Sequence, residues 1–252
     1  MLEVKNLCAG FGAHQVLKNV SFSLKPHKLT AVVGKNGCGK STLCAAIGQQ
    51  LHYTGEILFR GQNITLMHPS ERAKAISILP QMLTSPRITV QELVMFGRAP
   101  YLDFGKRPQK QDTEAVANAI SAMKLEHMAG RFVSSLSGGE RQRAYLAMIL
   151  AQETRLIVLD EPTTYLDLAY ETSFLTTLSE LKTRHKKTLM VVMHNLSQAV
   201  RHADNLVVLS GGAVAFSGSV EASLEQRVLE DVFGVKKYIF YEDGQQFVVF
   251  TA

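Results

Sequence analysis

The residues best suited to chemistry lie in a glycine-rich segment in the first fifth of the chain. Residues 34–41 read GKNGCGKS, which fits the pattern G-x-x-x-x-G-K-[ST], and they lie between an apolar run at Thr30–Val33 and a helix-period stretch at Thr42–Gly48. Glycines let backbone N–H groups approach a phosphate closely, and the start of the following helix adds partial positive charge. We therefore expect Lys40 to reach the β- and γ-phosphates of a nucleotide and Ser41 to ligate Mg²⁺. The residues predicted to bind nucleotide here are Gly34, Lys35, Asn36, Gly37, Cys38, Gly39, Lys40, Ser41 and Thr42.

Two adjacent carboxylates follow another apolar run. Residues 156–159 read LIVL, which is typical of a strand buried on both faces, and Asp160 and Glu161 come directly after it. Ligands of open α/β sheets bind at the carboxyl ends of strands. We expect Asp160 to hold Mg²⁺ through water and Glu161 to orient or deprotonate an attacking water. The alternative is that both residues merely lead from the strand into the turn at Pro162.

Two further predicted strands end in polar side chains. His194 follows the apolar run Leu189–Met193, and Gln81 comes two residues after the run Ile76–Leu79. The imidazole is suited to contact a γ-phosphate oxygen, and the amide is suited to contact a metal ion or a water molecule. A structural role after a strand remains the alternative for both residues.

A serine and two glycines precede the longest predicted helix. Residues 136–140 read LSGGE, and the helix-period stretch Arg141–Gln152 follows. Ser137 and Glu140 fit a capping box, so an ordinary capped helix is one interpretation. Gly138 and Gly139 each lower helix propensity by roughly 1 kcal/mol relative to alanine, which suits a helix start that a ligand approaches. Both interpretations remain open from the residues alone.

The order of apolar runs predicts how these residues are positioned. From about Leu29 onward, short β-branched runs alternate with helix-period stretches, which predicts an α/β fold with a mostly parallel sheet. The first 30 residues alternate differently and predict an antiparallel sheet. Residues 87–145 predict an inserted helical subdomain, and Lys237–Phe250 predict a hairpin that turns at residues 242–244. We expect residues 1–252 to form a single domain.

Composition excludes several protein classes. The 252 residues are 46% hydrophobic, which excludes a disordered or collagen-like chain, and the apolar runs are far shorter than the roughly 18 residues of a membrane-spanning helix. The odd number of cysteines, 3, and the absence of a basic-then-apolar leader favour a reduced cytoplasmic protein without a disulfide framework. A formal net charge of +5 weakly favours anionic partners, although an ordinary solvated surface is the more common reason for such a charge.

Taken in order along the chain, these motifs resemble the ATP-binding cassette (ABC) ATPases, and the resemblance covers nearly the whole sequence. Its parts are the Walker A loop at Gly34–Ser41, the Q-loop Gln81, the signature at Leu136–Glu140, Walker B at Leu156–Glu161, the D-loop at Thr163–Asp167 and the switch histidine His194. The resemblance implies a P-loop NTPase core that uses ATP and Mg²⁺, with Gln81 and Asp160 near the metal and Phe11 stacked on adenine. It also implies a head-to-tail dimer in which Ser137, Gly138 and Gly139 of one subunit complete the site of the other.

Two segments, Glu92–Tyr101 and Glu161–Ala169, resemble ATPase subunits of bacterial importers for iron-siderophores, haem and vitamin B12. This resemblance implies a peripheral ATPase at the cytoplasmic face of the inner membrane. Its partners would be integral permease subunits and, indirectly, a substrate-binding protein, with no nucleic acid. The helical subdomain and Gln81 would form a groove for a permease helix, and the loop at Tyr101–Pro108 would add an aromatic and basic partner surface.

The predicted cargo is a chelated iron compound, either a ferric siderophore or haem. Vitamin B12, a metal ion, an oxyanion, or an exporter with separate membrane subunits are the alternatives. A DNA-maintenance ATPase is excluded because Ser41 and Ser137 are too close in the chain for an intervening coiled coil. Three positions depart from the family pattern: Lys35, Cys38 and Asn195.

Overall fold

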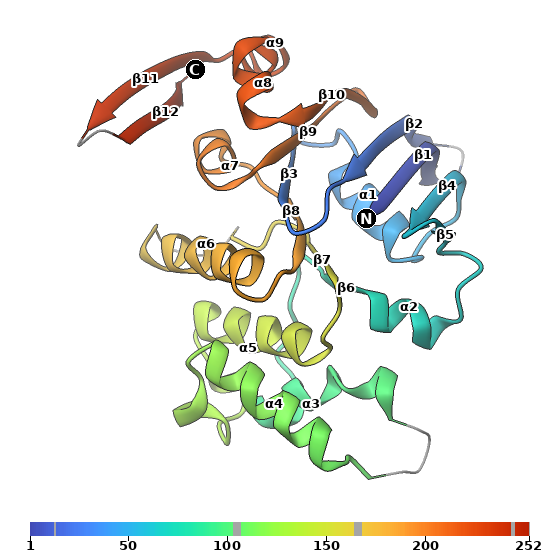
Figure 1. Ribbon diagram of the computed structural model, residues 1–252, viewed down its shortest axis with the longest axis vertical. Coiled ribbons are helices and arrows are strands. Elements are labelled where there is room, and N and C mark those ends of the chain that lie inside the picture. Colours follow the sequence, from blue (N-terminus) through green and yellow to red (C-terminus); the bar gives the residue numbers. More distant parts are fainter. Residues whose placement is uncertain (13, 103–106, 164–167, 243–244, 252) are drawn as a thin grey trace.

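The central sheet of the computed structural model organises the chain (Figure 1). The structure describes residues 1–12, 14–102, 107–163, 168–242 and 245–251. The strand order is β10 (Ala213–Ser219), β9 (Asn205–Ser210), β3 (Leu29–Gly34), β8 (Thr188–Val192), β7 (Leu156–Leu159) and β6 (Ile76–Leu79). All neighbouring pairs are parallel except β9 and β10. The prediction of a mostly parallel α/β sheet is therefore confirmed.

The middle strands are buried along their whole length because both faces of this sheet are covered. Every residue of β3, β7 and β8 is buried. Ile157 and Leu159 face one hydrophobic core, which includes the helices of the lower half in Figure 1, whereas Leu156 and Val158 face a second core shared with the N-terminal sheet. This arrangement explains the continuous apolar runs, since neither face of a middle strand contacts water.

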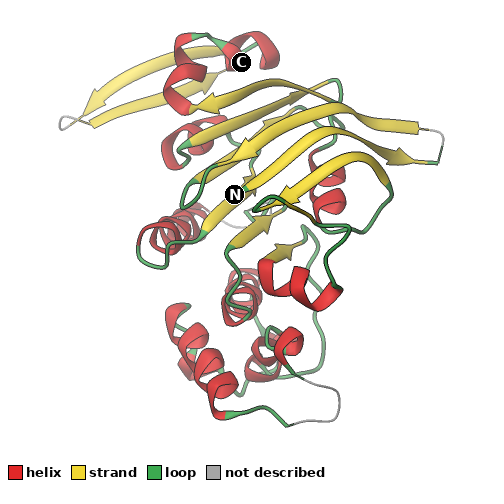
Figure 2. Ribbon diagram, turned by 45° about the vertical axis from the view of Figure 1, so that its right-hand side comes forward, coloured by secondary structure: helices red, strands yellow, loops and turns green. Residues whose placement is uncertain are grey.

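A second, antiparallel sheet covers one face of the central sheet (Figure 2). Its order is β2 (His14–Leu24), β1 (Leu2–Phe11), β4 (Tyr53–Phe59) and β5 (Gln62–Asn63). The sequence predicted an antiparallel sheet formed by the first 30 residues alone. The prediction therefore missed β4 and β5, which come later in the chain. The pairing of β4 with β1 joins Tyr53 to Ala9 and Phe59 to Leu2, and no local pattern encodes such long-range pairing.

The helices occupy both sides of the sheets. Helix α1 (Lys40–Ile47) packs in the core shared by the two sheets. The other helices outside the lobe described next are α2 (Pro69–Ala75), α6 (Leu168–Thr183), α7 (Leu196–His202), α8 (Val220–Glu225) and α9 (Val228–Phe233). None of the helices in the described part of the chain is long and apolar enough to cross a bilayer.

Three helices form a lobe at one end of the molecule (Figure 1). They are α3 (Val90–Phe96), α4 (Lys110–Ala122) and α5 (Gly138–Ala151), joined by the short 3-10 helices η1 (Ala99–Tyr101), η2 (Glu126–Met128) and η3 (Val133–Ser135). Apolar side chains of all three α-helices belong to the larger core. The boundaries of this lobe as a subdomain stay a prediction.

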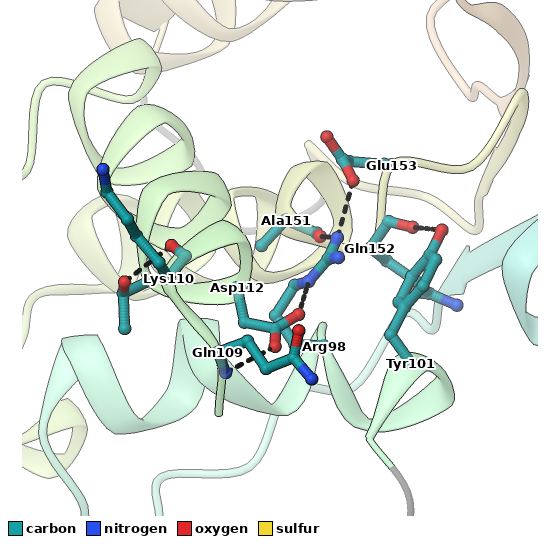
Figure 3. Close-up of polar contacts among 9 residues, drawn as sticks. Arg98, Tyr101, Gln109, Lys110, Asp112, Ala151, Gln152 and Glu153 are labelled. Carbon is teal, nitrogen blue, oxygen red and sulfur yellow. Dashed lines mark hydrogen bonds and ion pairs between the residues drawn. The ribbon is translucent and has the colours of Figure 1, made fainter. Parts of the chain in front are cut away.

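A buried arginine forms hydrogen bonds between separate segments of the lobe (Figure 3). Arg98 donates hydrogen bonds to Asp112 Oδ1 at 3.0 Å and to the carbonyl of Ala151 at 2.7 Å. Its guanidinium lies 4.0 Å from the ring centroid of Tyr101, and the Tyr101 hydroxyl donates to the carbonyl of Gln152 at 3.0 Å. Tyr101 is thus half-buried and held inside the lobe, in contrast to the exposed partner surface expected of it. Of that expected surface, residues 103–106 lie outside the described residues.

The C-terminal segment forms a hairpin of β11 (Lys236–Glu242) and β12 (Gln245–Thr251). It projects from the body near α8 and α7 (Figure 1). The hairpin predicted over Lys237–Phe250 is confirmed as two paired strands, while residues 243–244 of its turn lie outside the described residues.

Candidate nucleotide-binding site

The glycine-rich segment links the end of β3 to the start of α1. Gly39 has φ +106°, and a Cβ there would lie 2.5 Å from Leu17 Cδ2. A Cβ on Gly34 would lie 2.6 Å from the carbonyl oxygen of Leu209. Both positions therefore require glycine, because Gly39 has a positive φ and because Leu17 of β2 and Leu209 of β9 leave no room for a side chain. Cys38, which is part of the loop, is buried.

Lys40 is almost fully buried within this loop. Its side chain is 5% exposed, and its Nζ donates to the carbonyls of Gly34 at 2.9 Å and Lys35 at 3.3 Å. No carboxylate forms an ion pair with it in the described part of the chain. The adjacent start of α1 has no side-chain cap, so its first N–H groups are available to an acceptor. Together these groups form a binding site for an anion such as phosphate.

A hydroxyl and a carboxylate are hydrogen-bonded to each other beside the loop. Ser41 Oγ donates to Asp160 Oδ1 at 3.3 Å, and Asp160 is 7% exposed. Burial raises the pKa of Asp160 above its ordinary value, while the Ser41 hydrogen bond acts in the opposite direction and the charge of Glu161 raises the pKa further. A hydroxyl and a buried carboxylate are hard oxygen ligands of the kind that Mg²⁺ prefers, and a cation would compensate the buried charge. The donor set fits the metal ion that the sequence predicted.

Glu161 lies at the centre of three strand ends. His194 Nε2 is 2.5 Å from Glu161 Oε1, and the amide of Gln81 donates to Glu161 Oε2. The three residues follow β7, β8 and β6, whose carboxyl ends meet at one edge of the parallel sheet. Glu161 has φ +49°, a conformation that non-glycine residues rarely adopt and that is typical of functional sites.

Asn195, one of the departures from the family pattern, has a local structural role. It is the N-cap of α7, and its Oδ1 accepts a hydrogen bond from the Gln198 N–H at 3.1 Å. Asparagine and aspartate are about equally good N-caps. Asn195 can therefore start the helix behind His194 as an aspartate would.

A cleft of about 580 Å³ joins the loop to these strand ends. Its lining residues are Val16, Asn36, Gly37, Gly39, Lys40, Ser41, Thr42, Gln81, Glu161 and His194. Most of the predicted site residues therefore meet in one place, with Gly34 and Lys35 supplying carbonyls to Lys40. The sequence missed Val16, because an apolar residue in an alternating strand carries no chemical signal.

Four predicted site residues lie apart from both the cleft and the glycine-rich loop. Phe11 is 63% exposed and belongs to a separate hollow on the antiparallel sheet, together with His14 and Tyr53. Ser137, Gly138 and Gly139 lie at the start of α5. The capping box is present there, since Ser137 Oγ accepts from the Glu140 N–H at 3.3 Å and the Glu140 carboxylate accepts from the Ser137 N–H at 2.8 Å. A Cβ on Gly138 would meet nothing within 4 Å, so packing within the chain does not require glycine there.

Comparison with known proteins agrees with this geometry. The family model described as ABC transporter matches residues 17–164. The probable siderophore transport system ATP-binding protein YusV of Bacillus subtilis (strain 168) is 39% identical, over 93% of this chain and 86% of the relative. The ferric enterobactin transport ATP-binding protein FepC of Escherichia coli (strain K12) is 38% identical, over 93% of this chain and 88% of the relative.

A solved structure extends the similarity to the whole fold. A metal-chelate type ABC transporter in an inward-facing conformation matches with a TM-score of 0.86 and 28% identity, over 99% of this chain and 96% of that one. The matched family model spans the glycine-rich loop, the start of α5 and the strand before Glu161. The chain therefore belongs to the ABC transporter family and is one of its ATP-binding ATPase subunits.

Proposed function

We propose that this ATPase energises the import of a chelated iron compound through separate membrane subunits. The observation that carries the ATPase part is the meeting of Lys40, Ser41 and Glu161 around one cleft, with Asp160 accepting a hydrogen bond from Ser41. The cargo is supported by the similarity to YusV and FepC, which are named for a siderophore transport system and for ferric enterobactin transport. Haem is the other form of chelated iron within this proposal.

In this mechanism, different residues of the chain bind the phosphates, hold the metal ion and accept a proton. Lys40 and the N–H groups at the start of α1 bind the β- and γ-phosphates, and Ser41 and Asp160 would hold Mg²⁺. Bound Mg²⁺ would neutralise charge on the phosphate oxygens. Glu161 accepts the proton of the attacking water. His194 contacts the γ-phosphate, Gln81 contacts the metal or the water, and Phe11 stacks on the adenine.

The Glu161→Gln variant tests the assignment of the base. The amide retains the shape of the side chain but cannot accept a proton, so ATP binding should persist while turnover is nearly abolished. The measurements are fluorescent-nucleotide binding and phosphate release by the purified protein. Hydrolysis close to the parent rate would reject Glu161 as the base.

The active unit in this proposal is a head-to-tail dimer. Ser137, Gly138 and Gly139 do not line the cleft of their own chain, and the open space beside Gly138 is compatible with a nucleotide bound by a second copy. A two-fold arrangement gives each site the same composition, with the loop from one subunit and the signature from the other.

Integral permease subunits are the proposed membrane partners. Met82, directly after Gln81, is 83% exposed, and Phe96 at the end of α3 is 60% exposed. These apolar side chains support a docking groove for a permease helix between the Q-loop and the lobe. The ATPase would then act peripherally at the cytoplasmic face of the bacterial inner membrane and meet a substrate-binding protein only indirectly.

The cargo is tested by transport in a strain that lacks this ATPase. Uptake of labelled ferric siderophores or haem should fall and return when the gene is supplied again. The purified ATPase should bind no siderophore, since selectivity resides in its partners. Normal uptake of chelated iron together with loss of vitamin B12, metal-ion or oxyanion uptake, or loss of an export activity, would overturn the cargo and leave the ATPase mechanism intact.

A further inference from the structure

The C-terminal hairpin has one attached strand and one outer strand. Strand β12 contacts α7, where the Phe250 N–H donates to Ser197 Oγ at 3.2 Å and the Arg201 guanidinium lies 5.2 Å from the Phe247 ring centroid. Strand β11 pairs only with β12 in the described part of the chain, and the hairpin extends away from the body (Figure 1). Half of the N–H and C=O groups of β11 therefore point away from any partner strand.

The outer strand carries an unusually apolar surface. Tyr238, Ile239, Phe240 and Tyr241 are consecutive and are 45%, 43%, 56% and 74% exposed. The rings of Tyr238 and Phe240 stack on the same face with centroids 6.5 Å apart. An exposed apolar edge strand without charged or proline residues at its centre is a site for pairing with another chain.

The sequence of β11 indicates which chain would pair with it. The strand reads KKYIFYE, with Lys236 at its start and Glu242 at its end. If two copies run antiparallel with Ile239 opposite Ile239, each Lys236 faces the Glu242 of the other copy and each Tyr238 faces a Phe240. Opposite charges and aromatic pairs in directly opposed positions stabilise antiparallel strands. Neither Lys236 nor Glu242 forms an ion pair within the described residues of its own chain.

We propose that β11 pairs with β11 of a second copy of this chain, around a two-fold axis through Ile239. The product is a continuous four-stranded sheet in the order β12, β11, β11, β12. It pairs the exposed edge of each β11 strand with that of the other copy. The contact is isologous and closed, so it yields a dimer in place of a fibre. It uses no residue of the nucleotide cleft and therefore forms without ATP, unlike the composite dimer proposed for hydrolysis.

Cysteine cross-linking of the full-length protein, without nucleotide, tests the pairing. The background variant carries Cys8→Ser, since Cys38 and Cys44 are buried. Ile239→Cys places the thiols opposite each other, within the Cα separation of about 4.4–6.8 Å that a disulfide accepts. Val249→Cys is the matched control, because Val249 is 37% exposed on the same hairpin but would lie about 16 Å from its copy, three strand spacings across and two residues along the strands. We expect the first variant to form a disulfide-linked dimer and the second to remain monomeric.

Charge reversal then tests the register. In the Ile239→Cys background, Lys236→Glu and Glu242→Lys each place like charges opposite one another and should slow cross-linking, whereas the double variant restores opposite charges and should recover the parent rate. Thermal melting confirms that each variant is folded. Equal cross-linking of the 239 and 249 variants, no recovery in the double variant, or cross-linking that requires ATP would overturn the proposal. A loss of binding to phosphatidylglycerol vesicles by Phe240→Asp, without any cross-link at 239, would assign the strand to a lipid surface instead.

Discussion

Replacing Arg98 with alanine should strongly destabilise the fold. The Arg98 side chain is 4% exposed and that of Asp112 is 3% exposed, and they form an ion pair at 3.0 Å (Figure 3). The guanidinium also donates to the Ala151 carbonyl at the end of α5 and to Glu153 Oε2, each at 2.7 Å. Its removal leaves a buried carboxylate without a counter-charge and a helix-end carbonyl without a donor.

The expected magnitude follows from this burial. Breaking a buried ion pair by removing one partner costs about 3–5 kcal/mol. For a domain of this size, each kcal/mol lowers the melting temperature by roughly 2–4 °C, so the shift should be on the order of 10 °C. Glu153→Gln is the matched control. It removes the charge of the partner whose side chain is 58% exposed, and such a pair contributes about 1 kcal/mol at most.

The effect should also depend on pH with a definite sign. The backbone N–H of Gln109 holds the pKa of Asp112 below its ordinary value, with a further contribution from Arg98 and against the effect of burial. A carboxylate with a lowered folded-state pKa contributes stability above its unfolded pKa and loses that contribution as the pH falls through the folded value. The deficit of Arg98→Ala should therefore be largest near neutral pH and shrink below about pH 4.

Urea denaturation of the parent, Arg98→Ala and Glu153→Gln at pH 7 and at about pH 3, below the ordinary aspartate range, measures these differences directly. ATP binding by the folded Arg98→Ala protein should persist, since Arg98 does not line the cleft. A deficit for Arg98→Ala no larger than that of Glu153→Gln would refute the argument from burial. A large deficit that is unchanged at about pH 3 would assign the effect to lost packing over Tyr101 in place of charge.

Other substitutions test the nucleotide site and the contacts of Asp204 at the start of β3. Lys40→Ala should lose nucleotide affinity because the phosphate charge then has no buried counter-charge, and unchanged binding of fluorescent ATP would contradict that role. Mixing Lys40→Ala with Ser137→Arg should recover ATP hydrolysis through one intact composite site per heterodimer, whereas activity equal to the sum of the separate variants would contradict a shared site. Asp204→Asn should lower the unfolding free energy by about 2 kcal/mol at pH 7, because Asp204 accepts from the Leu29 N–H and pairs with Lys28 and Lys182. Those contacts lower the pKa of Asp204 despite its burial, so the deficit should vanish as the pH falls below the ordinary aspartate range in urea titrations.

The parts of the fold that the sequence predicted well are those specified by local pattern. The strands ending before Gln81 and Asp160 begin and end where the apolar runs do, because strands buried on both faces consist mostly of apolar residues. The glycine-rich loop was equally predictable, because its glycines form a local sequence pattern. The structure shows why Gly39 is needed there: its φ is positive, and a Cβ would collide with Leu17.

Features that depend on distant segments were missed for a physical reason. Strand β4 joins the N-terminal sheet by pairing with β1, and its own residues do not specify the partner. Val16 reaches the cleft only because β2 lies against the glycine-rich loop. The buried Arg98 could not be recognised from sequence, since its acceptors Asp112 and Ala151 come from two other helices.

At the start of α5, contacts within the chain explain the capping residues but not the glycine between them. The contacts between Ser137 and Glu140 explain why a helix begins there, but they do not explain Gly138, which would have room for a side chain. Glycine in a helix costs roughly 1 kcal/mol relative to alanine, so a position that tolerates it without an internal packing reason indicates an external one. An approaching anion supplies that reason, since a bare helix start offers it N–H groups and partial positive charge. The unexplained glycine is therefore better evidence for a second subunit's nucleotide at this position than the capping serine beside it.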